Sequence, residues 1–475
     1  MARSDKSKPA PGAHPVEDSA SADERRAQGK ALREVAPRVS QAGWKPPKSR
    51  RDPIELLDES NVGRVPELIP IRFGRMAASP LAFYRGSAAL MAADLATTPT
   101  SGLRVQACGD AHLMNFGGFA TPERNVIFDI NDFDETLPAP FEWDLKRLAA
   151  SLVIAAQHLR LPDSDAARVA DTCAREYRER MNDYAAMHAL EVWYDKIDLQ
   201  RFEDKAGDPE VVQRVRKGLA GLIEAERVKT APEHAYPKLV SHQGARPRIK
   251  DDPPRIYHPS EQAFPGLEAA YAQAFAAYRE SLADHVRILF DRFRLQDMAM
   301  KVVGVGSVGT ICGVGLFLAA ADHPLFLQVK QARASVLEPF AGRSRYPNHG
   351  QRVVAGQHLM QTASDIFLGW TRDGSGQDFY IRQLRDLKIS MDIEGWDLGL
   401  LREYARVCAH ALARAHARSG DAAMISGYLG SGPTFDDAIG EFAVEYSDQN
   451  SRDYRAFTRA IRDGRIKACE EEPAP

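Results

Sequence analysis

The spacing of apolar residues changes near Arg292, and this change constrains the fold more than any other feature of the sequence. Before it, long segments such as 142–159 repeat apolar residues with the helical spacing of about 3.6. After it, short β-branched and aromatic runs are separated by glycines, which is typical of antiparallel strands. We expect strands at 300–305, 310–319, 325–330 and 379–384. The sequence therefore predicts an α+β protein with a larger helical lobe and a small antiparallel sheet lobe.

Length and composition divide the 475-residue chain into four predicted parts. The chain is too long for one ordinary core. Residues 1–30 are rich in Ala, Ser, Pro and charge, which predicts a disordered tail. A helical lobe is expected over 31–293 and a sheet lobe over 294–392, and residues 393–475 are expected to return to the helical lobe as helices. Besides 142–159, helices are expected at 79–96, 163–191, 208–229, 266–293, 350–369 and 400–418.

Charge and cysteine content argue against several classes of protein. The net charge of −3 gives no electrostatic support for nucleic acid as a partner. The five cysteines are scattered without a CxxC pair, which fits a reducing compartment. The charged start lacks the apolar core of a signal peptide, and no apolar run approaches the roughly 20 residues of a membrane helix. We therefore expect a cytoplasmic protein without a membrane partner.

One segment combines carboxylates and an amide in a pattern suited to a metal and a phosphate. Asp110 and Asn115 lie in one short loop, and the acidic segment 131–135 follows soon after, directly behind a predicted strand. Phosphoryl transfer needs a carboxylate base and oxygen ligands for Mg²⁺. Asp110 suits the base, whereas Asn115 and Asp132 suit the metal, with Asp129 as an alternative to Asp132. An acidic turn without function and metal-assisted hydrolysis are the competing interpretations.

Two further polar residues near this loop are expected to support it. His112 is a tempting catalyst, but we expect it to make a structural hydrogen bond that holds the loop. Asp144, in the next predicted helix, is expected to cap or brace the same loop.

A glycine-rich segment precedes a lysine in the predicted sheet lobe. The segment 304–309 has the pattern GxGxxG between two predicted strands, and Lys330 ends the third strand. In kinases a glycine loop between strands covers the ATP phosphates, and a strand lysine reaches them. Glu338 is the candidate carboxylate partner of Lys330, and the alternative is a glycine hairpin with a surface lysine. The predicted nucleotide-binding residues are Gly304, Gly306, Ser307, Gly309, Lys330 and Glu338.

Three arginines lie upstream of the carboxylate loop. Arg72, Arg75 and Arg85 could form a clamp for phosphate or for an acidic acceptor, with Arg85 as the preferred candidate. Ion pairs on a helix surface are the alternative interpretation.

The carboxylate segment resembles a known enzyme group. Gly109-Asp110-x-His112-x-x-Asn115, followed by Asn131-Asp132-Phe133 and by Asp144, resembles the aminoglycoside and choline phosphotransferase branch of the kinase-like superfamily. Cys108 departs from the usual His, and Asn131 departs from the usual Ile. In kinases the glycine loop and lysine precede the catalytic loop, whereas here they follow it. The resemblance therefore implies a two-lobed, kinase-like fold in circularly permuted order.

The chain from about residue 31 onward also resembles a bacterial family described as a domain of unknown function, DUF2252. The shared motifs are 72–76, 79–86, 109–112, 131–135, 364–369 and 415–418. That family supplies no substrate, so the functional expectation rests on the residues. We expect a phosphotransferase that uses ATP and Mg²⁺ on an unidentified hydroxyl of a small molecule or protein. Nucleotidyl (AMP) transfer, a nucleotide-sensing pseudokinase and a metal-dependent hydrolase remain as alternatives.

Overall fold

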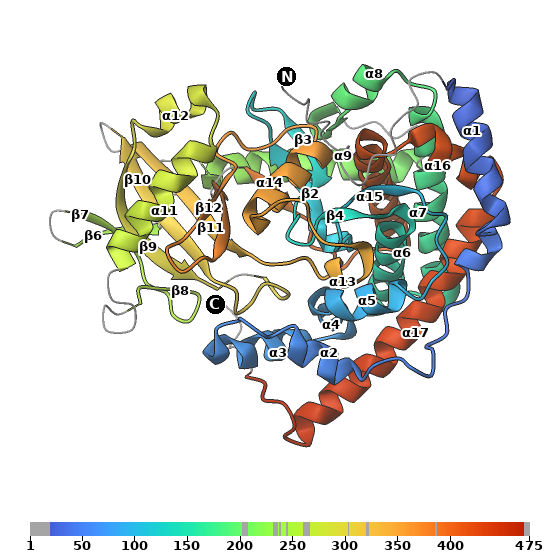
Figure 1. Ribbon diagram of the computed structural model, residues 1–475, viewed down its shortest axis with the longest axis horizontal. Coiled ribbons are helices and arrows are strands. Elements are labelled where there is room, and N and C mark those ends of the chain that lie inside the picture. Colours follow the sequence, from blue (N-terminus) through green and yellow to red (C-terminus); the bar gives the residue numbers. More distant parts are fainter. Residues whose placement is uncertain are drawn as a thin grey trace, which may run out of the picture.

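A computed structural model describes residues 20–201, 208–230, 236, 239–243, 246–259, 267–302, 304–319, 323–384 and 387–469. It is a mixed α+β structure with small antiparallel sheets, as the change of pattern near Arg292 predicts. Figure 1 shows the largest sheet on the left and most of the helices on the right. No helix in these residues is both long and apolar enough to cross a bilayer.

The largest sheet has six antiparallel strands in the order β12-β13-β11-β10-β9-β8. Its strands are β8 (Ile256–Tyr257), β9 (Arg294–Lys301), β10 (Cys312–Ala319), β11 (His323–Ala332), β12 (Gly369–Arg372) and β13 (Asp378–Gln383). The predicted strands at 310–319, 325–330 and 379–384 are confirmed within a few residues. The strand expected at 300–305 instead ends at Lys301, because the glycine-rich turn begins before residue 305.

The predicted boundary at 293/294 divides residues that belong to the sheet. Helices α11 (Leu267–Ser281) and α12 (Asp284–Phe290) pack on it, and Tyr278 and Phe290 bury their rings with Phe317 of β10. The hairpin of β6 (Val240–Gln243) and β7 (Arg246–Ile249) also contacts it. An exposed apolar sheet face is costly in water, so these segments cover it. The sheet lobe thus begins well before residue 294.

Helix α6 (Phe141–His158) forms the centre of the helical part and is buried over almost its whole length. It is surrounded by α7 (Asp163–Tyr184), α15 (Leu398–Ser419) and α17 (Thr434–Arg462). Two helices from the C-terminal part of the chain, α15 and α17, thus pack against α6 and α7. The other helices are α2 (Pro53–Glu59), α3 (Ile69–Ala77), α4 (Pro80–Gly86), α5 (Ala88–Leu95), α8 (Ala189–Tyr194), α9 (Pro209–Thr230), α13 (Glu338–Ala341), α14 (His349–Met360) and α16 (Ala422–Leu429).

The predicted disordered tail is wrong for its final residues. Helix α1 (Ala22–Ala31) is capped by Ser21 and packs on α16. A Cβ at Gly29 would lie 1.9 Å from the carbonyl oxygen of Met424, so glycine permits this close contact. Residues 1–19 lie outside the described part of the chain.

Two small sheets hold the loops that carry the carboxylates. Strand β1 (Arg104–Ala107) pairs with β4 (Leu137–Pro140). A four-stranded sheet has the order β14-β2-β3-β5, with strands β2 (Phe116–Ala120), β3 (Val126–Ile130), β5 (Ile197–Asp198) and β14 (Lys388–Ser390). The Asp110 loop joins β1 to β2, and the acidic loop joins β3 to β4. Residues of both loops line one cavity, and the acidic loop contacts the large sheet through Asp134 and Lys330 of β11.

Candidate functional site

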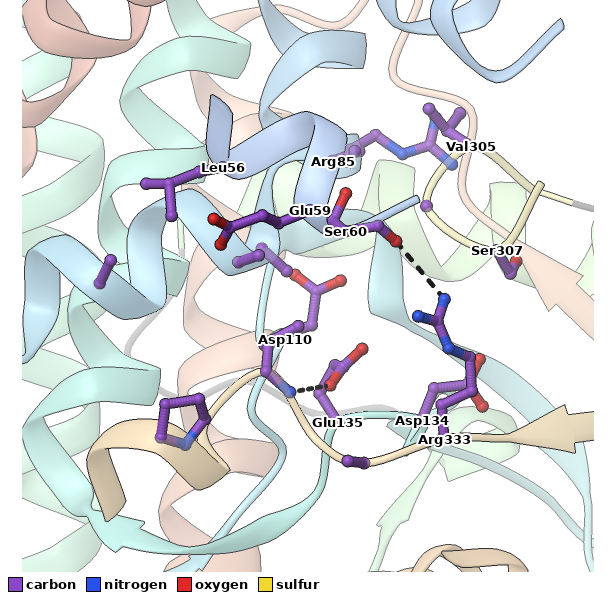
Figure 2. A pocket seen from close by; sticks show the side chains of 18 of the residues that line it. Leu56, Glu59, Ser60, Arg85, Asp110, Asp134, Glu135, Val305, Ser307 and Arg333 are labelled. Carbon is purple, nitrogen blue, oxygen red and sulfur yellow. Dashed lines mark hydrogen bonds between the residues drawn. The ribbon is translucent and has the colours of Figure 1, made fainter. Parts of the chain in front are cut away.

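A cavity of about 700 Å³ lies where the two carboxylate loops meet the large sheet and the N-terminal helices. Asp110, Asp134 and Glu135 enter it from the two loops, and Arg333 enters from the end of β11 (Figure 2). Of the predicted site residues, those that line it are Arg85, Asp110, Asn115, Asp132, Gly304, Gly306 and Ser307. Two segments nearly 200 residues apart in sequence thus face one space.

The Asp110 loop is held from behind by a buried polar chain. Asp144 accepts hydrogen bonds from the backbone N–H groups of Cys108 (2.6 Å) and Gly109 (2.9 Å). His416 Nε2 lies 3.2 Å from the same carboxylate, and its Nδ1 lies 2.7 Å from the Tyr177 hydroxyl. Carboxylate bonds to backbone N–H groups are strong in a buried setting. The predicted bracing role of Asp144 is confirmed.

Gly109 permits the two carboxylate loops to touch. Its φ is +84°, and a Cβ there would lie 2.3 Å from the carbonyl oxygen of Glu135. The Asn131 N–H also donates to the Asn115 carbonyl oxygen at 2.8 Å. The two loops therefore form one rigid wall of the cavity.

Asp110 is oriented by a buried arginine. Arg147 donates through Nε (2.8 Å), and its Nη2 lies 2.6 Å from the same Oδ1. Its guanidinium stacks 4.2 Å from the Tyr84 ring centroid. Although burial alone lowers the pKa of Arg147, the Asp110 carboxylate raises it above its ordinary value. Asp110 is therefore held beside a permanent positive charge with its other oxygen, Oδ2, directed away from that bond.

His112 supports the same loop, as predicted. Its Nδ1 accepts the Met114 backbone N–H at 3.2 Å. Burial, together with the positive charges of Arg147 and Arg85, holds the pKa of His112 well below its ordinary value. Its Nε2 lies 3.9 Å from Asp110 Oδ2, beyond hydrogen-bond distance. His112 is thus a neutral structural side chain.

The acidic loop meets the lysine of the large sheet. Lys330 Nζ lies 2.8 Å from Asp134 Oδ2 and 4.0 Å from Asp132 Oδ1. The Tyr380 hydroxyl donates to the other oxygen of Asp134 at 2.5 Å. Burial and the charge of Asp134 raise the pKa of Asp132. Asp134 is thus the paired carboxylate, while Asp132, with 37% of its side chain exposed, remains open to the cavity.

Glu338 is not the partner of Lys330, contrary to the prediction. Its carboxylate lies 3.8 Å from His349 Nδ1, and Lys330 pairs with Asp134 instead. Helix α14 reaches the site through Arg352, which donates to the carbonyl oxygens of Asp134 (2.8 Å) and Arg333 (2.7 Å). Asp134 and Lys330 are far apart in sequence and meet only in the folded protein. The search for a carboxylate shortly after Lys330 in the sequence therefore could not find this pair.

Asp129 lies outside the cavity. It is fully buried on β3, where it forms an ion pair with Arg414 of α15. Its carboxylate also accepts the backbone N–H groups of Ile130 (2.8 Å) and Thr362 (3.2 Å). All its partners belong to the protein interior. Of the two predicted alternatives, only Asp132 faces the space where a metal could bind.

The glycine-rich turn is held against the N-terminal helices. Gly304 (φ +71°) and Gly309 (φ +86°) adopt backbone angles that favour glycine. Arg75 donates to the Gly304 carbonyl oxygen, and Arg64 donates to that of Val308, both at 2.6 Å. Gly309 itself does not line the cavity. These hydrogen bonds therefore hold the turn in place between the large sheet and helix α3.

A second cavity of about 450 Å³ adjoins the first. The two share Asp132, Gly304 and Ser307, and Lys330 lines the second. Arg382 and Lys388 also line it. Burial and the nearby Arg382 lower the pKa of Lys388 to about 8.

Asn115 and Asp132 are suited to hold a hard cation. Asn115 Nδ2 donates to the Asp110 carbonyl oxygen at 2.8 Å, which leaves its side-chain oxygen for a ligand. Mg²⁺ prefers such oxygen ligands and usually keeps water or phosphate in its shell. In the described ranges, no three His, Cys, Asp or Glu side chains are placed to hold a metal alone. A cation here would need oxygens from a bound molecule or water.

A family profile covers nearly all of these residues. The family described as "Uncharacterized protein conserved in bacteria (DUF2252)" matches residues 64–460. The chain belongs to the DUF2252 family. Searches of curated proteins and of solved structures returned no match.

Several site residues of this DUF2252 protein were not anticipated from the sequence. Arg147 is a buried charged residue in an otherwise apolar helix pattern, three residues after Asp144. This unusual position could have indicated a role at the site. Arg64 and Arg333 line the cavity from loops that carry no motif. Their roles depend on contacts between distant segments.

Proposed function

We propose that this DUF2252 protein is an ATP- and Mg²⁺-dependent phosphotransferase that acts on a hydroxyl group. One observation carries the proposal: Lys330 of the sheet meets Asp132 and Asp134 at the edge of the cavity that Asp110 lines. A lysine, metal-type carboxylates and a separate carboxylate base are the parts that phosphoryl transfer requires.

The sheet supports a nucleotide as the donor. A glycine-rich turn joins β9 to β10, Lys330 is on the next strand, and helix α14 follows it. Kinases use the same order of turn, strand lysine and helix. Here these parts follow the Asp110 loop in sequence, so the proposal includes a kinase-like fold in permuted order. We place the adenine ring and the α- and β-phosphates of ATP in the adjoining cavity, which Lys330 and Arg382 line.

Asp110 is the proposed base. It takes the proton of the acceptor hydroxyl, whose oxygen bonds to the γ-phosphorus. The bond from that phosphorus to the bridging oxygen of ADP breaks, and ADP leaves. Arg147 holds Oδ1 of Asp110 at 2.8 Å through Nε and so fixes the orientation of this carboxylate in the cavity wall. Lys330 offsets phosphate charge, and Mg²⁺ held by Asn115 and Asp132 would supply further charge neutralisation when bound.

Nucleotidyl transfer is the second candidate. Lys330 pairs with Asp134 rather than with a helix carboxylate, which departs from kinases. Arg382 and Lys388 also add positive charge to the adjoining cavity. A triphosphate bound in the reverse direction would use these charges and present its α-phosphorus to Asp110.

The test follows two labels of ATP into products. The protein is incubated with small-molecule extract from bacteria and ATP labelled at the α- or γ-phosphate. The proposal predicts γ-label in a new product and a loss of about 100-fold or more in Asp110→Asn. Transfer of the α-label would establish nucleotidyl transfer instead. Free phosphate as the sole labelled product would indicate hydrolysis, and ATP binding without turnover would indicate a nucleotide sensor.

A further inference from the structure

The first cavity also contains four arginines that form no ion pair with a carboxylate among the described residues. They are Arg64, Arg72, Arg85 and Arg333. We propose that these arginines bind an anionic group, a phosphate or a carboxylate, of the acceptor molecule. The acceptor is then a small compound that carries both a hydroxyl and an anion. That the ligand is the acceptor rests on the proposed function, whereas the anion site itself is inferred from the contacts of the four arginines.

Among the described residues, three of the four guanidinium groups donate hydrogen bonds, and all of these go to neutral oxygens. Arg64 donates to the carbonyl oxygens of Ser60 (3.0 Å) and Val308 (2.6 Å). Arg72 donates to Asn61 Oδ1 (2.6 Å) and the Gly86 carbonyl oxygen (2.9 Å), and Arg333 donates to the carbonyl oxygens of Ser60 and Val62. Within the described ranges, none of the four forms an ion pair. Glu135 attracts Arg64 and Arg333 from a distance, but no carboxylate of the described residues is in direct contact with the four guanidinium groups.

Two of these side chains have buried nitrogen atoms without a partner. Arg72 is 2% exposed and Arg85 is partly buried, and Nε of each lacks a hydrogen-bond partner among the described residues. No protein group in those ranges accepts a hydrogen bond from the Arg85 guanidinium at all. A buried donor without an acceptor is costly. An anion in the cavity would satisfy these donors.

The arginines also repel one another. Burial and then the charges of Arg64 and Arg333 hold the pKa of Arg72 well below its ordinary value. Burial and Arg333 likewise lower the pKa of Arg64 to about 10. Confining like charges in a partly buried space costs free energy, and a bound anion would recover it.

The acids of the same cavity do not supply that anion. Glu59, Asp94, Asp110 and Asp134 are each paired with another arginine or with Lys330, and Asp132 Oδ1 lies 4.0 Å from Lys330 Nζ. Glu135 accepts the Val336 N–H at 2.7 Å and contacts none of the four arginines as an ion pair. The positive charge of the cluster therefore remains available to a ligand.

Position favours the acceptor over the nucleotide as the source of the anion. None of the four arginines lines the adjoining cavity, where Lys330, Arg382 and Lys388 offer a separate positive group for a triphosphate. In Figure 2, Arg85 lies beside Val305 and Arg333 points toward Ser60, so both flank the space that faces Asp110. An anion between them would hold the rest of its molecule near that base.

The test is calorimetric titration of orthophosphate into the full-length protein at fixed ionic strength, without nucleotide. Orthophosphate is expected to bind, and Arg85→Gln and Arg333→Gln are each expected to weaken it roughly 10- to 100-fold. Arg168→Gln is the matched control, because this arginine is 66% exposed on α7 and is expected to leave binding unchanged. Arg85 makes no hydrogen bond to the described protein, so its variant is expected to fold normally, and thermal unfolding checks this.

A second arm repeats the titration with a saturating non-hydrolysable ATP analogue and Mg²⁺. Binding of orthophosphate that persists, and still depends on Arg85, supports the acceptor site. Displacement of orthophosphate by the analogue would assign the arginines to the nucleotide and overturn the proposal. Absence of orthophosphate binding, or equal binding in all variants, would overturn it as well. Orthophosphate binding in a protein that does not bind the analogue would preserve the anion site and reject the proposed function.

Discussion

Asp129 and Asp132 lie three residues apart, but neutralising them is expected to affect different properties. The change at Asp129 should lower stability, and the change at Asp132 should abolish MgATP binding. In Asp129→Asn, the single amide oxygen can accept from only one of the Ile130 and Thr362 backbone N–H groups, because these donate to different carboxylate oxygens. The variant loses the charge that pairs with Arg414, and both side chains are 0% exposed. Nε and Nη1 of Arg414 already lack partners in the described ranges. We expect the free energy of unfolding to fall by about 3–5 kcal/mol, the usual cost of leaving a buried charge unpaired.

Asp132→Asn is the matched comparison. This carboxylate is partly exposed, and burial and the charge of Asp134 raise its pKa, so its charge adds little to stability. We expect a change within about 1 kcal/mol, together with loss of MgATP binding. Urea unfolding gives both stabilities, and calorimetry gives both affinities. An Asp129→Asn protein with wild-type stability and no MgATP binding would refute the assignment of Asp129 to structure and Asp132 to the metal.

Three further predictions concern other parts of the molecule. In Gly109→Ala, the positive φ and the contact with Glu135 are expected to cost about 2–5 kcal/mol, measured by urea unfolding, and unchanged stability would contradict the packing of the two loops. Burial raises the pKa of Glu135 from 4.5 to about 7, so its contribution to stability is full below pH 4.5 and is lost as the pH rises through 7. Glu135→Gln should remove the loss of stability between pH 4.5 and 7 that is measured by urea unfolding. An unchanged pH profile in this variant would exclude Glu135 as its source. Burial lowers the pKa of Lys146 to about 7, so Lys146→Met should stabilise the protein at pH 7 by a margin that shrinks toward pH 10, and a less stable variant would contradict this.

The sequence predicted the local parts of the site well. Asp110 and Asn115 lie in one short loop, Asp144 braces it, and the glycine turn and Lys330 occupy the expected strands. Each of these depends on spacing within about 40 residues, where hydrophobic pattern and turn chemistry determine the geometry. The mixed α+β class followed from the same patterns.

The parts that were missed depend on contacts across the fold. Lys330 was expected to pair with a helix carboxylate, but the acidic loop 196 residues away in sequence supplies Asp134. From the sequence, Asp129 was an alternative metal ligand to Asp132, but in the structure it forms a buried ion pair with Arg414. Helices α11 and α12 carry an ordinary helical pattern, and only the apolar face of the sheet decides that they pack there. No local pattern encodes these partners.

In the proposed function, segments far apart in sequence form one nucleotide site. Calorimetric titration of MgATP into wild-type protein, Lys330→Met and Asp132→Asn tests it most directly. We expect one binding site in the wild type and a loss of affinity of roughly tenfold or more in Lys330→Met and in Asp132→Asn, with Arg168→Gln unaffected. Wild-type affinity in both Lys330→Met and Asp132→Asn, or no binding of MgATP by the wild type, would contradict it.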